Sequence, residues 1–238
     1  MVLSTDTLWC ALAVMTGACL QGAGGIGFAL FAAPLVALVS PDLVPGPMIF
    51  LGGCVSLLAA LRERQAIDYR AAAAALAGRV PGSLLAGLAM GLLPRSAFAL
   101  LFAGLILGAV ALSLSGWRIR ASPLVMGGAG FASGFMGTIT SVGTPPMGLV
   151  MQNMAPARLR ATIGLFLVAG SAVSLAVLSG IGRFGWPEVQ RSLLLLPALA
   201  LGFWLSNPLR ERIDATALRR LVLGVCALSA LVLLWQHR

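Results

Sequence analysis

The chain contains no lysine among its 238 residues, and its single histidine, His237, lies next to the C-terminus. A nucleotide-binding P-loop requires a lysine after its glycines, so the sequence excludes ATP hydrolysis of that kind by this chain. An intramembrane hydrolase needs a nucleophile and a base within hydrogen-bond distance. The chain offers neither an internal histidine nor a membrane-embedded pair of carboxylates, and we therefore expect no enzyme activity.

Charge is scarce in this sequence. Charged residues make up 10% of the chain and hydrophobic residues 59%, with a mean hydropathy of +0.99. A soluble globular domain carries roughly 25% charged residues, so this chain needs lipid. Its apolar runs are long and continuous, which predicts spanning helices rather than strands. At about 20 residues a span, the length allows about eight spans and no soluble domain.

Cysteines are few and scattered. The four (Cys10, Cys19, Cys54 and Cys226) all lie in apolar segments and show neither a CxxC nor a Cys/His spacing. The pattern therefore predicts no disulfide framework, no metal site and no cofactor.

The charge that is present is mostly positive. Sixteen arginines face seven acidic residues, and the net charge is +9. These arginines stand singly or in pairs between apolar runs, as the cytoplasmic anchors of membrane proteins do. We therefore expect the lipid bilayer, and not nucleic acid, to be the partner of this charge.

One sequence unit occurs twice, with an offset of 116 residues. LILGAVALS at 105–113 corresponds to LVLGVCALS at 221–229, and the same offset maps Pro81 onto Pro197 and Gly27 onto Gly143. This predicts two homologous membrane repeats, 1–118 and 119–238, of about four helices each. Secondary transporters are often built this way, with the substrate site where the repeats meet.

Each predicted repeat opens with a segment that is too long for one span. The apolar segments are 8–39, 43–61, 71–93, 96–115, 123–151, 161–180, 192–206 and 216–235. The first and fifth correspond under the offset, and Gly, Ser, Thr and Pro interrupt both. Since Gly permits a bend and Pro stops a helix, we predict two helical pieces with an unwound middle in each.

The arginines indicate how often these broken segments cross the membrane. If each crosses once, the loop arginines divide evenly between the two sides. If each returns as a hairpin or re-entrant loop, one side collects Arg62, Arg64, Arg70, Arg118, Arg120, Arg158, Arg160, Arg210, Arg212, Arg219 and Arg220, and the other keeps Arg95, Arg183, Arg191 and Arg238. Only the second arrangement satisfies the positive-inside rule. It predicts inverted repeats with both termini outside the cytoplasm.

The two breaks and one buried charge are the candidate substrate-binding residues. An unwound segment with a half-helix N-terminus favours an anion through its free N–H groups. Arg79 is the one charge well inside an apolar segment, which is costly and therefore suggests a function. Close packing of small residues is the alternative for the breaks, and snorkelling to the surface is the alternative for Arg79. The candidates are Gln21, Gly24, Gly25, Gly27, Arg79, Thr138, Thr140, Ser141, Gly143, Thr144 and Pro145.

The two broken motifs also resemble those of a known family. They read GAGGIGFALFAAPLVAL at 22–38 and SGFMGTITSVGTPPMGLV at 133–150. In content and order the chain resembles the sulfite exporter TauE/SafE family of bacterial membrane permeases. The resemblance covers essentially the whole chain, although the second motif carries Thr, Ser and Pro where several Gly are usual. It implies transport of sulfite, organosulfonates or related carboxylates.

We therefore expect a secondary transporter of small anions that works by alternating access at the repeat interface. A metabolite or drug carrier of another inverted-repeat family is the alternative, although cationic drugs usually need a buried carboxylate. An intramembrane enzyme and a passive structural membrane subunit are further alternatives. The sequence is compatible with a homo-oligomer and leaves the exact anion and the coupling ion open.

Overall fold

The computed structural model describes residues 5–25, 27–92, 95–115, 119–209 and 215–236. Every regular element in these ranges is helical. The first half contains α1 (Thr5–Gly24), α2 (Phe28–Val39), α3 (Gly46–Arg62), α4 (Tyr69–Leu92) and α5 (Arg95–Leu114), with short 3₁₀ turns at Pro41–Leu43 and Arg64–Ala66. The second contains α6 (Pro123–Thr140), α7 (Thr144–Val150), α8 (Pro156–Gly180), α9 (Trp186–Leu209) and α10 (Ala215–Gln236). The all-α prediction is confirmed.

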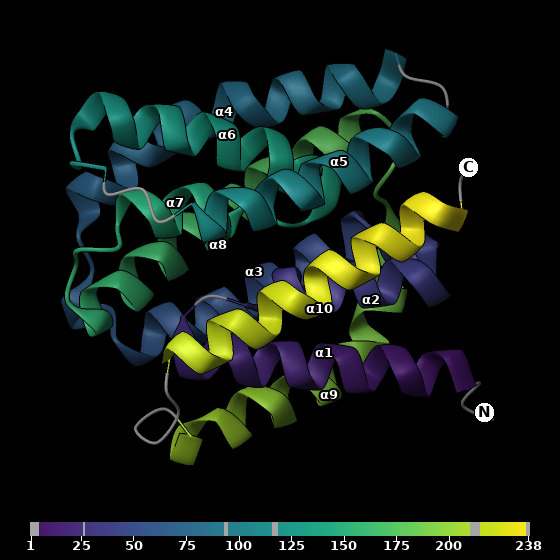
Figure 1. Ribbon diagram of the computed structural model, residues 1–238, viewed down its shortest axis with the longest axis horizontal. Coiled ribbons are helices and arrows are strands. Elements are labelled where there is room, and N and C mark those ends of the chain that lie inside the picture. The colour runs from purple at the N-terminus through teal and green to yellow at the C-terminus, as the bar shows by residue number, and fades with distance from the viewer. Residues whose placement is uncertain (1–4, 26, 93–94, 116–118, 210–214, 237–238) are drawn as a thin grey trace.

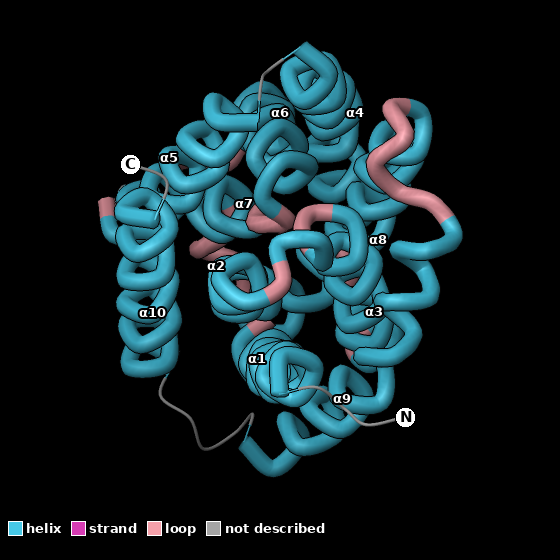
Figure 2. Tube along the Cα trace, turned by 90° about the vertical axis from the view of Figure 1, so that its right-hand side faces the viewer, coloured by secondary structure: helices cyan, strands magenta, loops and turns pink. Residues whose placement is uncertain are grey.

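The helices form one bundle whose long axis is horizontal in Figure 1. Viewed end-on, α2 and α7 lie at the centre, with α4 and α6 on one side and α1 and α9 on the opposite side (Figure 2). The first turn of α1 and the last turn of α10 lie at the same end of the bundle (Figure 1). We call the opposite end, where α3 and α9 end and α4 and α8 begin, the arginine-rich end.

The outer surface of the bundle fits lipid rather than water. Within the described residues, α1, α4, α8 and α9 are each long and apolar enough to span a membrane, while α2 and α3 are shorter apolar helices. Large apolar side chains on α4 and α9 are exposed, among them Leu88, Leu194 and Trp204. An apolar surface of this extent is not stable in water, so these faces need the hydrocarbon of a bilayer.

Both predicted breaks are present, and each one turns the chain back on itself. Gly17 on α1 lies against Phe28 and Ala32 on α2, so the two helices are antiparallel. In the second half, the Ser133 hydroxyl on α6 donates to the Gly143 carbonyl at the start of α7. Met126, near the start of α6, packs in one apolar cluster with Val150, at the end of α7. Each broken segment is therefore a helical hairpin, which raises the helices of each half from about four to five.

The two breaks begin with the same backbone conformation. Gly25 (φ 76°) and Ser141 (φ 67°) both take the left-handed conformation. Each donates its N–H to the carbonyl four residues earlier, Gln21 at 2.8 Å and Gly137 at 2.9 Å. This is a common way to end a helix, and Gly adopts it at little cost. Ser141 bears the steric cost of its Cβ, and its hydroxyl is fixed by donating to the Pro45 carbonyl at 3.1 Å.

Small residues let α4 approach α6, and α1 approach α9, at backbone distance. A Cβ added to Gly130 would overlap the carbonyl oxygen of Ala75 on α4. One added to Gly202 on α9 would overlap the carbonyl oxygen of Met15 on α1. Close backbone approach through small residues is a principal source of attraction between helices in lipid. Helix packing therefore accounts for these glycines, which lie outside the two breaks.

This close approach predicts a stability difference between two glycines of α6. Gly130→Ala is expected to lower the unfolding temperature, because overpacking costs about 1–3 kcal/mol and backbone atoms cannot move aside. Gly128, on the same helix, has open space around it. Gly128→Ala should be neutral or slightly stabilising, since Ala favours helix by up to about 1 kcal/mol over Gly. Thermal unfolding in detergent compares the two, and equal shifts would contradict the packing account.

Candidate functional site

Residues of both hairpins line one cavity. Its volume is about 30 Å³, above the roughly 10–15 Å³ that one water molecule requires. The first hairpin contributes Gln21, Phe28 and Ala29, and the second contributes Gly137, Ser141, Gly143 and Thr144. Helices α3, α4 and α8 complete the wall with Met48, Ile49, Gly52, Ser56, Arg79, Leu167 and Ser171. The cavity therefore lies where the two halves of the chain meet.

Among the described residues that line this wall, Arg79 alone is charged. Its residue surface is 3% exposed, so the side chain does not snorkel. Nη1 donates to the Ser133 hydroxyl at 2.8 Å, and the guanidinium carbon lies 5.0 Å from the centre of the Phe166 ring. Nε is buried and makes no hydrogen bond. A cation–π contact and one hydrogen bond offset only part of the cost of burying this charge.

No carboxylate of the described residues neutralises Arg79. Among the described residues, the ion pairs are Arg158 with Asp68 and Arg160 with Glu63. Buried charges in proteins are normally paired, and within a membrane an unpaired one is costly. The site therefore has one positive charge in excess, and an anion in the cavity would balance it.

Ser133 links this charge to the second hairpin. Its hydroxyl accepts from Arg79 and donates to the carbonyl of Gly143, in the break itself. A movement of α7 relative to α6 would therefore shift the partner of the guanidinium. The position of Arg79 is in this way coupled to the conformation of the break.

Gln21 is the matching polar group from the first hairpin. Its side-chain oxygen accepts from the N–H of Phe28 at 3.3 Å and so caps the start of α2. That N–H is therefore not available to a ligand, contrary to the expectation of free donors at this helix start. The amide nitrogen of Gln21 makes no hydrogen bond to any described residue, and it can donate into the cavity.

The comparison with known protein families agrees with this architecture. The model of the family described as Sulfite exporter TauE/SafE matches residues 9–233, nearly the whole chain. The chain belongs to the sulfite exporter TauE/SafE family. No curated protein and no solved structure gave a significant match. As a member of this transporter family with four long apolar helices, the chain is a multi-pass membrane protein.

In this TauE/SafE protein, the cavity brings together five of the eleven residues predicted to bind substrate. Gln21, Arg79, Ser141, Gly143 and Thr144 line it. The other six lie outside the cavity wall; they are Gly24, Gly25, Gly27, Thr138, Thr140 and Pro145.

Structural contacts explain several of these six. Gly25 lies against the side chain of Arg160, where a Cβ would overlap it. Thr138 shares a hydrogen bond of 2.8 Å with Ser174. Thr140 donates to the Met136 carbonyl and accepts from the Val142 N–H, which stabilises the end of α6. These hydroxyls bond within the protein and do not face the cavity.

Ser133 and Gly137 belong to the second broken motif, at 133–150, but were not among the candidates. Ser56, Ser171 and Phe166 of the TauE/SafE protein carried no signal in the sequence; the two serines line the cavity, and the Phe166 ring lies against Arg79. Each is a single residue within a long apolar helix, where small or aromatic residues usually serve packing. A buried Arg needs such partners on neighbouring helices, but the sequence does not say which helices are neighbours.

Proposed function

We propose that this protein is a secondary transporter of small anions, sulfite or organosulfonates among them, that binds its substrate at Arg79. The observation that carries the proposal is a buried guanidinium with no carboxylate partner among the described residues, facing a cavity between two hairpin breaks. A sulfite or sulfonate group offers the oxygen acceptors that a guanidinium binds best. Gln21 and the hydroxyls of Ser56 and Ser171 would complete the binding of its oxygens.

The packing of the helices supports a transporter built from two repeats, 1–118 and 119–238. The 116-residue offset relates α1 to α6 and α4 to α9. In the structure α1 packs on α9 while α6 packs on α4, so the offset converts one pairing into the other. The same exchange relates the pairing of α2 with α10 to that of α7 with α5. Such pseudo-two-fold packing around a central site is typical of alternating-access transporters.

The hairpins also support an inverted topology. Each half consists of one hairpin and three further helices; if each of these three crosses once, the number of net crossings is odd and the second half is reversed. The family of bacterial permeases implies that the membrane is the bacterial inner membrane. Arg62, Arg158 and Arg160 then share the arginine-rich end, where they contact Asn207, Asp68 and Glu63. The positive-inside rule makes this end cytoplasmic.

The site argues against the alternative functions. A carrier of cationic drugs would need a negative charge in the cavity, and the described part of its wall carries only the positive charge of Arg79. An enzyme would need a nucleophile paired with a base, and the wall residues that the structure describes include no histidine or carboxylate. A passive structural subunit has no need for an unpaired buried charge.

Ligand-dependent thermal stability tests the proposal. Purified protein should unfold at a higher temperature with sulfite, because binding at 100 times Kd stabilises by about 2.7 kcal/mol. The other test ligands are sulfate, thiosulfate, sulfoacetate, taurine and small carboxylates. Chloride at equal ionic strength is the control. A selective response to one oxyanion names the substrate class. A response to cations alone, or to no anion, would contradict the proposed function.

A further inference from the structure

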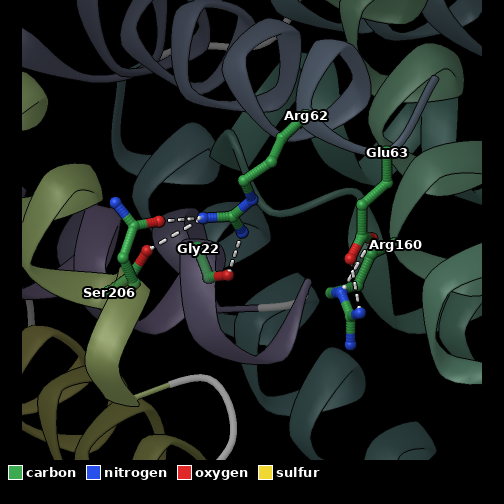
Figure 3. Close-up of polar contacts among 6 residues, drawn as sticks. Gly22, Arg62, Glu63, Arg160 and Ser206 are labelled. Carbon is green, nitrogen blue, oxygen red and sulfur yellow. Dashed lines mark hydrogen bonds and ion pairs between the residues drawn. The ribbon is translucent and has the colours of Figure 1, made fainter.

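A second group of charged residues lies at the arginine-rich end, close to the first hairpin break (Figure 3). Arg62, the last residue of α3, donates to Asn207 Oδ1 at 3.0 Å and Ser206 Oγ at 3.3 Å, and also to the carbonyl of Gly22. The last carbonyls of a helix have no partner within it and favour a cation. Arg62 thus joins the ends of α1 and α9.

The next residue, Glu63, forms a two-pronged ion pair with Arg160 on α8. Arg160 Nε and Nη2 donate to the two carboxylate oxygens at 2.9 and 2.6 Å. The side chains of Arg160 and Glu63 are only 15% and 11% exposed. The pair joins the end of α3 to the start of α8 (Figure 3).

The pair is connected to the cavity through the break. Arg160 lies so close to Gly25 that a Cβ there would overlap its side chain. The N–H of Gly25 donates to the carbonyl of Gln21, whose side chain lines the cavity and caps Phe28. Arg160 therefore contacts Gly25, which is hydrogen-bonded to Gln21, and Gln21 is in turn hydrogen-bonded to Phe28. Both Gln21 and Phe28 line the cavity.

At the opposite end, the positions equivalent to this charged group are uncharged. Under the 116-residue offset, Arg62, Glu63 and Arg160 correspond to Leu178, Ser179 and Val44. Leu178 lies in an apolar cluster with Ile49, Ala86, Met90 and Ile139, and Ile49 also lines the cavity. Arg183 borders this cluster and donates to the Met90 carbonyl at 3.0 Å. The position equivalent to Arg62 is nevertheless held by apolar packing. A partly buried ion pair is often no more stabilising than such packing, so the charges at the arginine-rich end suggest a role beyond stability.

We propose that Arg160 is a second anion-binding position on the route to Arg79, and that the Glu63 carboxylate occupies it while the route from the arginine-rich end is closed. This rests on the proposed anion transport. A carboxylate and a sulfite or sulfonate group present similar pairs of oxygens to a guanidinium. An arriving anion competes with Glu63 for Arg160. When the anion binds, the ion pair between the end of α3 and the start of α8 is broken, next to the first hairpin break. The Glu63 carboxylate thus occupies the position on Arg160 that the substrate anion would take.

Sulfite titrations of thermal stability test this competition. Glu63→Gln keeps the shape of the side chain and removes its charge, so it should lower the half-saturating sulfite concentration about tenfold, equivalent to about 1.4 kcal/mol. Glu63→Gln/Arg160→Gln should abolish this gain, because the second anion position is then gone. If the ion pair of Glu63 with Arg160 only stabilises the fold, both variants will bind sulfite as the wild type does, and this result would overturn the proposal.

A matched control is available at the same end. Asp68 pairs with Arg158 at 2.6 Å, but the Arg158 side chain is 57% exposed and the pair does not touch the break. Hydrogen bonds from the Ala71 N–H and from Arg158 lower the pKa of the Asp68 carboxyl. Asp68→Asn removes a charge of the same sign and should leave the sulfite titration unchanged. An equal effect of Asp68→Asn and Glu63→Gln would mean that net charge alone matters, and would overturn the role of Arg160.

An Arg79→Met background separates this inference from the proposed function. With Arg79 replaced, sulfite should stabilise the protein only when Glu63→Gln has freed Arg160. If the Arg79→Met/Glu63→Gln double variant is not stabilised by sulfite, Arg160 is not a second anion-binding position, and the proposal for Arg79 is unaffected. A full response to sulfite in Arg79→Met alone contradicts the proposed function instead. Should Glu63→Gln fail to fold, Glu63→Asp keeps the charge, shortens the side chain and is expected to give an intermediate shift in half-saturation.

Discussion

Arg79→Met is expected to make the protein more resistant to heat and unable to respond to sulfite. The guanidinium is buried with one hydrogen bond, to Ser133, and with no carboxylate partner among the described residues. Replacing buried charges by apolar side chains of similar length often stabilises a protein by about 1–4 kcal/mol. The wild type bears this cost because the charge binds the substrate, as residues in active sites often reduce stability.

Two measurements check this prediction. Thermal unfolding in detergent without ligand should show a higher unfolding temperature for Arg79→Met than for the wild type. Uptake of sulfite into proteoliposomes should fall to the level of empty vesicles, since Arg79 is the one charge among the described residues of the cavity wall. Arg70→Met is the control, because Arg70 lies on the same helix but is exposed at its start. A destabilised Arg79→Met with normal uptake would show that Arg79 is a structural residue.

The hairpin breaks could be predicted from the sequence because their cause is local. Gly, Ser, Thr and Pro interrupt two apolar segments at equivalent positions, and the structure ends α1 at Gly24 and α6 at Thr140. The arginine distribution then favoured hairpins over single crossings, and hairpins are observed. The first inference needed only local residue properties, and the second needed only the distribution of arginine along the sequence.

Helix ends were predicted less well where polar residues belong to helices. The segment predicted at 161–180 corresponds to α8, which begins at Pro156. The segment predicted at 192–206 corresponds to α9, which begins at Trp186. Near their starts these helices carry the polar residues Arg158, Arg160 and Glu188, which precede the apolar part of each helix. Hydropathy marks the apolar portion of a helix and does not separate a polar first turn from a loop. The error matters, because Arg160 lies near the start of α8.

The site itself depends on contacts between distant parts of the chain. The sequence singled out Arg79 but left open whether it snorkels or points inward. Ser133 on α6 and Phe166 and Gly170 on α8 decide this, and they are 54 or more positions away. Their role follows from the packing of α4 between α6 and α8, which no local pattern specifies.

Gly170→Val is expected to destabilise the protein strongly and to abolish the sulfite response. A Cβ at this position would overlap Nε and the neighbouring carbons of the Arg79 side chain. Overpacking usually costs about 1–3 kcal/mol, and here the displaced group is a buried charge that would lose its contacts with Ser133 and Phe166. Gly170 is therefore the residue that makes room for the buried guanidinium.

The double variant Gly170→Val/Arg79→Ala identifies the cause of that loss. Arg79→Ala removes the atoms that the valine would overlap, so the double variant should unfold at a higher temperature than Gly170→Val alone. Residues in contact show coupling energies of about 0.5–3 kcal/mol, whereas independent sites give additive effects. Gly180→Val is the control, because Gly180 ends the same helix with open space around it. Additive effects of Gly170→Val and Arg79→Ala would mean that the valine disturbs α8 by itself, and that Gly170 is not a determinant of the anion site.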